Sequence, residues 1–216
     1  MDYQLARNVM VAQQIRPWHV LDDKVLTLMA NTPREYFVPE AYRTLAYSDS
    51  EIPLEEGQVM LAPKIVARAL QALQIQPKDK VLEIGTGTGY ITALLAQLSQ
   101  SITSIENRQT LYDQAKKNLM SYPSLSLILG DGANGWAQNK PYDVIFATGS
   151  YPNKIPNTLL SQLNEKGRLF VVFGKLPIMQ ALLITKKYPE GIHQEALFET
   201  FIPPLDNTPK SSHFEW

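Results

Sequence analysis

The sequence contains no cysteine, and this absence removes several kinds of chemistry at once. Disulfide bonds and thiolate metal sites are excluded because both require cysteine sulfur. A cysteine nucleophile is excluded for the same reason. The three histidines lie far apart in the sequence and show no metal-ligand spacing. We therefore expect no metal site, and we interpret the histidines as surface or hydrogen-bonded residues.

The sequence also lacks a long hydrophobic run and a surplus of basic charge. No window approaches the roughly 20 apolar residues of a membrane span, and the first residues lack the apolar stretch of a signal peptide. The net charge is −1 and the Lys and Arg residues are scattered, whereas a nucleic-acid partner usually leaves a basic footprint. We therefore expect a cytoplasmic protein that binds neither membrane nor nucleic acid. No exposed apolar stripe stands out, so we expect a monomer.

What the sequence does have is a change of pattern near residue 76. Before it, helical periodicity dominates, with helices expected over about residues 2–15, after Asp22 or Asp23, and over 63–73. After it, short apolar strands alternate with amphipathic helices, which is typical of βαβ units and a parallel sheet. The expected strands cover residues 81–84, 102–105, 125–129, 144–147, 169–173, 181–185 and 196–201, and the later helices cover 90–98, 110–119 and 157–163.

These patterns predict an α/β protein with a Rossmann-like, doubly wound, mostly parallel sheet and an N-terminal helical extension. The short connection between the last two strands favours an antiparallel edge. A length of 216 residues suits a single domain, 1–216. We divide it into a helical segment, 1–75, and a Rossmann-like core, 76–216. The order of the last strands stays open.

The strongest local signal is the segment Val81–Tyr90, a strand that runs into three glycines and then into a helix. Glycine permits positive φ at a tight turn and lets the backbone approach a ligand closely. In an open α/β sheet the ligand lies at the carboxyl ends of the strands. A dinucleotide fingerprint reads G-x-G-x-x-G, but here the glycines are Gly85, Gly87 and Gly89. This G-x-G-x-G spacing, with Glu83 two residues ahead, resembles the first motif of S-adenosylmethionine-dependent methyltransferases.

Two acidic residues follow at the ends of later strands. Glu106 stands about 20 positions after the glycine loop, where an acidic residue hydrogen-bonds ribose hydroxyls; the alternative is a surface glutamate. Asp131 follows the third strand, where the resembling enzymes contact the adenine amino group; the alternative is a plain Asp-Gly turn. Together the signals predict S-adenosyl-L-methionine as the cofactor. The expected cofactor-binding residues are Glu83, Gly85, Thr86, Gly87, Gly89, Glu106, Asp131 and Gly132.

Segments outside the cofactor loop narrow the resemblance to protein-L-isoaspartate O-methyltransferases. They are Met10–Arg16, Thr32–Arg34 with Tyr36–Pro39, Leu45–Tyr47, Gly57-Gln58 with Ala62-Pro63, Asp131-Gly132 with Gly135-Trp136, and Phe201–Pro203. The resemblance covers nearly the whole chain in order. It implies methyl transfer to the α-carboxyl of an L-isoaspartyl residue in a damaged protein or peptide, which begins repair through a succinimide. We expect residues 76–216 to bind the cofactor. We expect residues 1–75 to shape the acceptor site, with Tyr47–Pro63 closing over the cofactor; the alternative is a packing layer that covers the sheet.

The chain departs from the resembling family at the acceptor pocket. After Gly-Gln the family normally reads Thr-Ile-Ser, whereas this chain reads Val59-Met60-Leu61. Leu61 therefore stands where the family has its active-site serine, so no catalytic residue can be named. The family usually has alanines after the threonine that corresponds to Thr148, whereas this chain continues with glycine and serine. The expected substrate-binding residues are Val59, Met60, Leu61, Thr148 and Gly149.

Three interpretations of this departure remain at this stage. The first is a protein carboxyl methyltransferase of the isoaspartyl type, whose anionic acceptor needs no general base and relies on in-line placement. The second is a methyltransferase on the same scaffold with a different, less polar acceptor facing the Val-Met-Leu wall. The third is a non-catalytic module that binds S-adenosylmethionine. The identity of the acceptor stays open.

Overall fold

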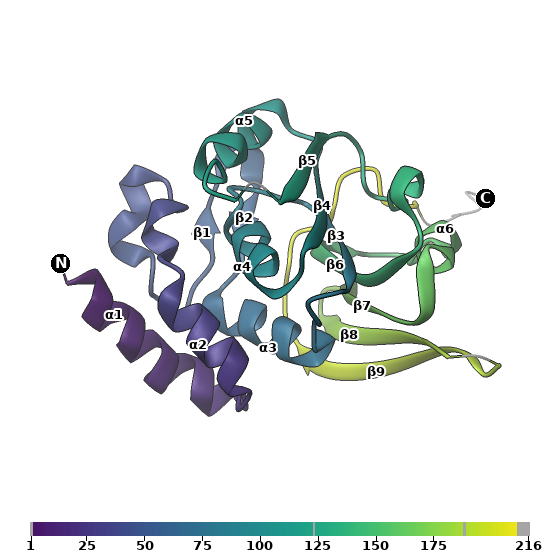
Figure 1. Ribbon diagram of the computed structural model, residues 1–216, viewed down its shortest axis with the longest axis horizontal. Helices are drawn as coiled ribbons and strands as arrows, with labels where there is room; N and C mark the ends of the chain where they lie inside the picture. The colour runs from purple at the N-terminus through teal and green to yellow at the C-terminus, as the bar shows by residue number, and fades with distance from the viewer. Residues whose placement is uncertain (1, 123, 188, 211–216) are drawn as a thin grey trace.

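The computed structural model describes residues 2–122, 124–187 and 189–210 (Figure 1). Within these ranges, one sheet has the strand order β5-β4-β3-β6-β7-β8-β9. Each neighbouring pair from β5 to β7 is parallel, whereas β8 pairs antiparallel with both β7 and β9. The bounds are β3 (Lys80–Ile84), β4 (Ser101–Glu106), β5 (Leu125–Leu129), β6 (Tyr142–Tyr151), β7 (Leu163–Lys175), β8 (Ile178–Lys187) and β9 (Gly191–Glu199).

The predicted mostly parallel, Rossmann-like sheet and its antiparallel edge are confirmed. The last three strands lie in chain order, which settles the point that the sequence left open. The predicted strand over 196–201 is misplaced, because β9 begins at Gly191 and ends at Glu199. The first residues of β9 are exposed and mostly polar, so no apolar run in the sequence marks where this edge strand begins.

The helices agree with their periodicity, with two differences. Their bounds are α1 (Tyr3–Met10), α2 (Asp23–Asn31), α3 (Pro63–Leu73), α4 (Tyr90–Leu98), α5 (Gln109–Asn118) and α6 (Asn157–Ser161). The helix expected over 2–15 is α-helical only to Met10 and continues as a π-helix over Val11–Ile15. The helix expected over 157–163 ends at Ser161, because Leu163 already belongs to β7. As predicted, α3 begins at Pro63, where proline suits the first turn.

A small hairpin in the N-terminal segment was not predicted. Its strands, β1 (Ile52–Pro53) and β2 (Val59–Met60), pair antiparallel around a 3₁₀ turn over Glu55–Gly57. Two-residue strands are too short to show the alternation that marks a strand in sequence. The hairpin matters because it carries Val59–Met60 to the edge of the main sheet.

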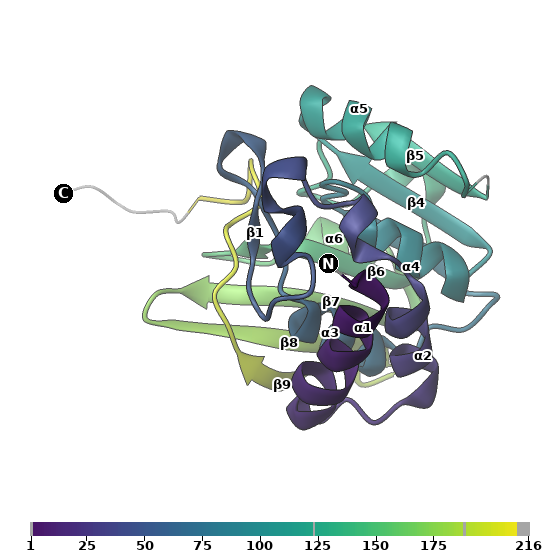
Figure 2. The same cartoon turned by 90° about the vertical axis from the view of Figure 1, so that its left-hand side faces the viewer.

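Apolar side chains fill both faces of the sheet, as alternating residues of one strand show. Phe146 packs in the cluster that also holds Leu26 of α2, Val66 of α3 and Leu94 of α4. Ile145 packs in a second cluster, on the other face, with Leu159 of α6. The N-terminal helices therefore form a layer over one face, as Figures 1 and 2 show. Among the described residues, no helix combines the length and apolar character that crossing a membrane requires.

After β9 the chain returns to the carboxyl end of β6. We call residues 202–207 the strap; it is the yellow segment that runs up from β9 in Figure 2. Ser150 fixes it through three hydrogen bonds: its amide donates to Pro203 O (3.0 Å), its hydroxyl to Ile202 O (2.8 Å), and its carbonyl accepts from Leu205 N (3.1 Å). The strap thereby lies beside the ends of the central strands.

Candidate active site

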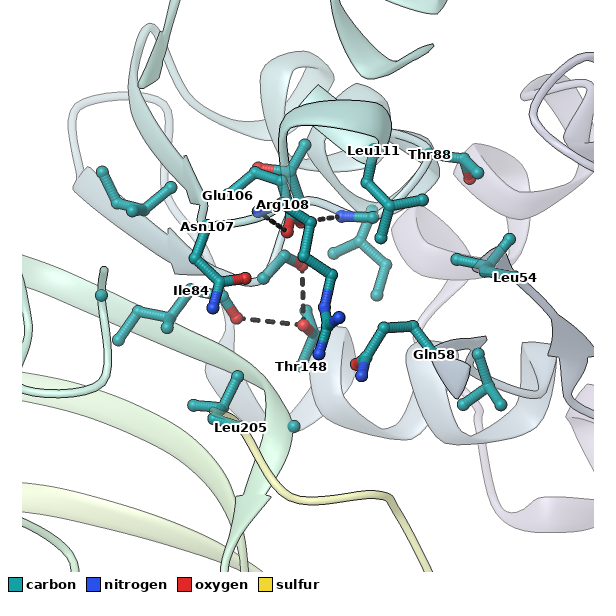
Figure 3. Close-up of a pocket in the computed structure, with 18 of the residues that line it drawn as sticks. Leu54, Gln58, Ile84, Thr88, Glu106, Asn107, Arg108, Leu111, Thr148 and Leu205 are labelled. Carbon is teal, nitrogen blue, oxygen red and sulfur yellow. Dashed lines mark hydrogen bonds between the residues drawn. The ribbon is translucent and has the colours of Figure 1, made fainter. Parts of the chain in front are cut away.

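A cavity that is partly open to solvent lies at the carboxyl ends of β3, β4, β5 and β6 (Figure 3). This is the edge where open parallel sheets bind ligands. Most of its walls come from the β1–β2 hairpin, the glycine loop, the residues at the carboxyl ends of β4, β5 and β6, and the strap, and Arg34 and residues of α4 and α5 also line it. Expected site residues that line it are Val59, Met60, Leu61, Gly85, Thr86, Gly87, Glu106, Asp131, Gly132, Thr148 and Gly149.

The glycine loop turns sharply between β3 and α4. Gly85 has φ +92°, and a Cβ added there would collide with the hydroxyl of Thr148. The Thr148 Oγ1 lies 2.7 Å from Gly85 O and 3.0 Å from Ile84 O, and so ties the end of β6 to the end of β3 (Figure 3). Glycine at position 85 is therefore required both by the left-handed backbone and by the close approach of a neighbouring strand.

Gly89 differs from the expectation that it lines the binding site. It is the N-cap of α4, with φ +91°, and a Cβ there would come within 2.9 Å of the Leu119 side chain. It does not line the cavity. Its place in the motif is explained by the turn into α4 and by packing.

Glu106 faces the cavity from the end of β4. One oxygen of its carboxylate accepts a hydrogen bond from Gly87 N (2.8 Å), and the other accepts from Arg108 N (3.0 Å). Burial raises the pKa of Glu106, and hydrogen bonds from the backbone amides oppose that shift. Since each carboxylate oxygen can accept about two bonds, Glu106 holds the glycine loop and retains acceptor capacity toward the cavity.

Asp131 lies at the other side of the same end of the cavity. Its Oδ1 accepts from Ala133 N (2.9 Å), which makes a turn after β5. Its Oδ2 accepts from the Asn207 amide (3.1 Å), which belongs to the strap. The side chain is thus fixed by the backbone on one side and by the strap on the other.

Glu83 lies behind the site and not in it, contrary to the expectation that it contacts the cofactor. Its side chain is fully buried and does not line the cavity. Its Oε2 accepts from Thr92 Oγ1 of α4 and from Ser104 Oγ of β4, both at 2.6 Å. Ser104 in turn contacts the Thr86 hydroxyl at 2.6 Å. Glu83 therefore connects β3, β4, α4 and the loop from behind; burial raises its pKa to about 8.

The opposite wall of the cavity is apolar. Val59 and Met60 belong to β2, and Leu61 follows them with only 4% of its surface exposed. The Leu61 carbonyl accepts a hydrogen bond from Arg34 Nη2 (2.9 Å). The wall that the sequence predicts is thus brought to the cavity, and its side chains offer no hydrogen-bond donor.

The strap explains why glycine and serine stand at positions 149 and 150. Between Phe146 and Ser150 the pairing of β6 with β7 shifts register, so that residues 147–149 bulge at the sheet edge. A Cβ at Gly149 would lie 2.8 Å from the Leu205 side chain. Ser150 is fully buried under the strap. Glycine allows the strap to approach, and serine holds it there.

Sequence reasoning missed the polar residues that surround the cavity mouth. Arg108 extends over it and pairs with Glu56 of the hairpin turn (2.6 Å) and Asp206 of the strap (2.7 Å). Asn107 also donates to Asp206 (2.8 Å), and Gln58 points into the same space (Figure 3). The only sequence signal for the strap was the family resemblance at Phe201–Pro203, and that resemblance did not predict that the segment lies beside the cavity. Arg34 was also missed.

The lining suits S-adenosyl-L-methionine. Glu106 and Asp131 present carboxylate oxygens with remaining acceptor capacity, which a ribose diol and an amino group can use. The Thr88 hydroxyl lines the cavity and is buried without a hydrogen-bond partner among the described residues. Ile105 and Leu111 add apolar surface of the kind that flat ring systems contact. The fold and this cavity define an S-adenosylmethionine-dependent methyltransferase.

The family model for protein-L-isoaspartate(D-aspartate) O-methyltransferase (PCMT) matches residues 5–208, and the chain belongs to this family. The chain is similar to the protein-L-isoaspartate O-methyltransferase of Koribacter versatilis, with 39% identity over 208 residues, 95% of this chain and 93% of the relative. It also resembles a solved protein-L-isoaspartate O-methyltransferase with TM-score 0.77 and 28% identity, over 88% of this chain and 63% of that one.

A further solved relative shares the fold at lower identity. It is a protein-L-isoaspartate O-methyltransferase structure from Plasmodium falciparum in complex with S-adenosyl-L-homocysteine, with TM-score 0.78 and 19% identity, over 92% of this chain and 97% of that one. At this identity the similarity is one of fold.

Proposed function

We propose that this chain methylates the α-carboxyl group of L-isoaspartyl residues in damaged proteins or peptides. The observation that carries the proposal is that the glycine loop, Glu106, Asp131 and the Val59–Leu61 wall all line one and the same cavity. The family match over residues 5–208 supports the same reaction. When bound, S-adenosyl-L-methionine supplies a methyl group on a sulfonium sulfur, which is already an activated leaving group.

The residues of the cofactor end have proposed roles that follow from their chemistry. Glu106 accepts hydrogen bonds from the ribose hydroxyls, and Asp131 accepts one from the adenine amino group. Gly85, Thr86, Gly87 and Gly132 let the backbone approach the ligand, because their positions carry little or no side chain toward it. Glu83 and Gly89 act from behind the loop by holding β4 and α4.

The acceptor end needs no general base. A carboxyl group with an ordinary pKa near 4 is an anion at neutral pH, so no proton has to be removed before transfer. The task of Val59, Met60, Leu61, Thr148 and Gly149 is therefore to place the acceptor in line and to exclude water. No histidine lines the cavity in the described chain, which agrees with a reaction that depends on placement.

A methyl-transfer assay tests the proposal. The protein is mixed with methyl-labelled S-adenosyl-L-methionine and an L-isoaspartyl peptide, beside the same peptide with normal aspartate. We expect label on the isoaspartyl peptide alone, and we expect it to be released in mild base, because a methyl ester is base-labile. Cofactor binding without label on that peptide would contradict the proposal and favour a different acceptor. Cofactor binding without turnover on any acceptor would favour a non-catalytic module.

Three further expectations belong to this proposal. We propose that the protein acts as a monomer and without nucleic acid, in line with its scattered charge and net charge of −1. We propose that residues 1–75 shape the acceptor site within one domain, in line with the position of the hairpin against the cavity. The cytoplasmic location stays a prediction.

A further inference from the structure

Arg34 is a buried cation at the acceptor end of the cavity. Only 1% of its surface is exposed, and it lines the cavity beside Leu61. Among the described residues, no carboxylate forms an ion pair with it, and its Nε is buried without a hydrogen-bond partner. Its stabilising contacts are the Leu61 carbonyl (2.9 Å) and the ring of Tyr90, 4.9 Å from the guanidinium carbon.

The neighbouring buried arginine shows what a balanced site looks like in this protein. Arg7 is also buried, and it pairs with Glu35 Oε1 (3.3 Å) and donates to the Tyr47 hydroxyl (2.9 Å). Tyr47 donates to the other oxygen of Glu35. Glu35 is adjacent to Arg34 in sequence, yet both of its oxygens serve the Arg7 network. The acidic residue nearest in sequence is thus not the partner of Arg34.

A buried charge without a counterion is costly, so the arrangement calls for an anion from outside the chain. Burial lowers the pKa of Arg34, and Tyr90 opposes the shift; the guanidinium nonetheless remains charged at neutral pH. Its planar set of donors matches a carboxylate. The wall beside it, Val59–Leu61, offers side chains without donors, and the serine hydroxyl that the family has at position 61 is absent here.

We propose that Arg34 binds the α-carboxylate of the acceptor and supplies the charged donor that the Leu61 side chain lacks. The inference rests on the proposed function, because it takes an isoaspartyl carboxylate as the ligand. The acceptor end is favoured over the cofactor's own carboxylate because Arg34 holds the backbone of Leu61 and lies against the acceptor wall. Arg34 is then a binding residue whose loss weakens the recognition of charge.

The test compares two peptides that differ only in that charge. One carries L-isoaspartate, and the other carries the same residue with its α-carboxyl converted to a carboxamide. Their dissociation constants are measured with wild type, Arg34→Gln and Arg34→Lys in the presence of S-adenosyl-L-homocysteine. We expect wild type to prefer the carboxylate by about tenfold or more, the value of a hydrogen bond to a charged group. We expect the preference to be largely lost in Arg34→Gln and partly kept in Arg34→Lys.

Arg68→Gln is the matched control. Arg68 also donates to backbone carbonyls, Trp18 O (2.9 Å) and Leu197 O (3.3 Å), and stacks on an aromatic ring, Phe198, at 5.1 Å. It does not line the cavity. We expect Arg68→Gln to keep the preference for the carboxylate peptide. Thermal unfolding of all variants shows whether each is folded, and the retained charge of Arg34→Lys gives a second reading if Arg34→Gln is unstable.

Two results would overturn the inference while leaving the proposed function intact. In the first, Arg34→Gln weakens both peptides equally, which is the signature of a structural role. In the second, Arg34→Gln removes the preference for S-adenosyl-L-homocysteine over 5′-methylthioadenosine, which lacks the amino-acid carboxylate. That result would assign Arg34 to the cofactor. If wild type neither binds nor methylates the isoaspartyl peptide, the proposed function fails as well.

Discussion

The two ends of the cavity are built in different ways. At the cofactor end, polar groups are already held by the protein: Glu106 accepts two backbone amides, and Asp131 accepts Ala133 N and the strap. At the acceptor end, an apolar wall stands over the buried guanidinium of Arg34, which has no anionic partner in the described chain. The first end is complete before a ligand arrives, and the second has a charge that a ligand can balance.

This difference shows which parts of the fold recognise the cofactor and which recognise the acceptor. The cofactor end depends on backbone positions at the ends of parallel strands, which the sheet itself fixes. The acceptor end depends on side chains of the two-residue strand β2, of Leu61 after it, and of Arg34, which begins the 3₁₀ helix Arg34–Tyr36. Substitutions should therefore act on binding of the cofactor at one end and on choice of the acceptor at the other.

The largest effect is expected at Gly85. Replacing it by alanine forces a left-handed backbone on a residue with a Cβ and drives that carbon into the Thr148 hydroxyl. We expect Gly85→Ala to weaken S-adenosyl-L-homocysteine binding by about a hundredfold or more, by calorimetry, because a misplaced loop loses several contacts at once. Gly191→Ala is the matched control: Gly191 has φ +89° but nothing lies within 4 Å. Equal losses in both variants would show that strain alone explains the effect.

A second prediction concerns the support behind the cofactor end. Burial raises the pKa of Glu83 from 4.5 to about 8. Between these values the folded chain keeps a proton that the unfolded chain releases, so stability falls as pH rises. One proton corresponds to about 1.4 kcal/mol per pH unit at most. We expect the free energy of unfolding of Glu83→Gln, relative to that of wild type, to increase by about 1 kcal/mol for each pH unit from pH 5 to 8.

Denaturant titrations at several pH values measure this difference. Glu195→Gln, at an exposed position in β9, is the control: its free energy of unfolding should differ from that of wild type by the same amount at every pH. If the difference between Glu83→Gln and wild type also stays constant with pH, Glu83 is ionised in the folded protein, and the cofactor end carries a buried charge.

At the acceptor end, we expect Leu61→Ser to raise turnover on the isoaspartyl peptide. A hydroxyl donor to a charged group contributes about 1.5–3 kcal/mol, which is about tenfold to a hundredfold in rate if it acts in the transition state. Leu61→Ala separates the donor from the space, since it removes the branched side chain without adding a hydroxyl. An increase of the same size with alanine would show that Leu61 acts by crowding. Binding of S-adenosyl-L-homocysteine should stay unchanged in both variants.

The smallest effect is expected at the mouth that joins the two ends. Arg108→Gln removes the pairs with Glu56 and Asp206, and partly exposed pairs contribute up to about 1 kcal/mol each. We expect S-adenosyl-L-homocysteine to dissociate about two- to fivefold faster by stopped flow, with weaker dependence on salt. Arg168→Gln, which breaks a pair with Asp79 away from the cavity, should leave this rate unchanged. A wild-type rate in Arg108→Gln would mean that the mouth opens without breaking these pairs.

Sequence reasoning placed most of the expected cofactor-binding residues along one cavity, because the signals for their positions are local. Strand periodicity places the loop, and the glycine spacing and strand-end acids follow from the sheet. Glu83 lies behind the cavity because alternation along β3 turns its side chain to the back of the loop, and the sequence motif does not record that direction. Arg34, Arg108 and the strap were missed because each comes from a distant segment whose position depends on tertiary packing.

The strap is the last part of the cavity wall to be synthesised. Every strand of the main sheet ends by Glu199, while Ile202, Pro203, Leu205 and Asp206 complete the cavity wall. A chain still being synthesised therefore makes the whole sheet before it makes the segment that closes the site. Apart from Ile202, the buried hydrophobic core consists of residues made before the strap. Folding can therefore run ahead of ligand binding, and the site is completed by the residues translated last among those that line it.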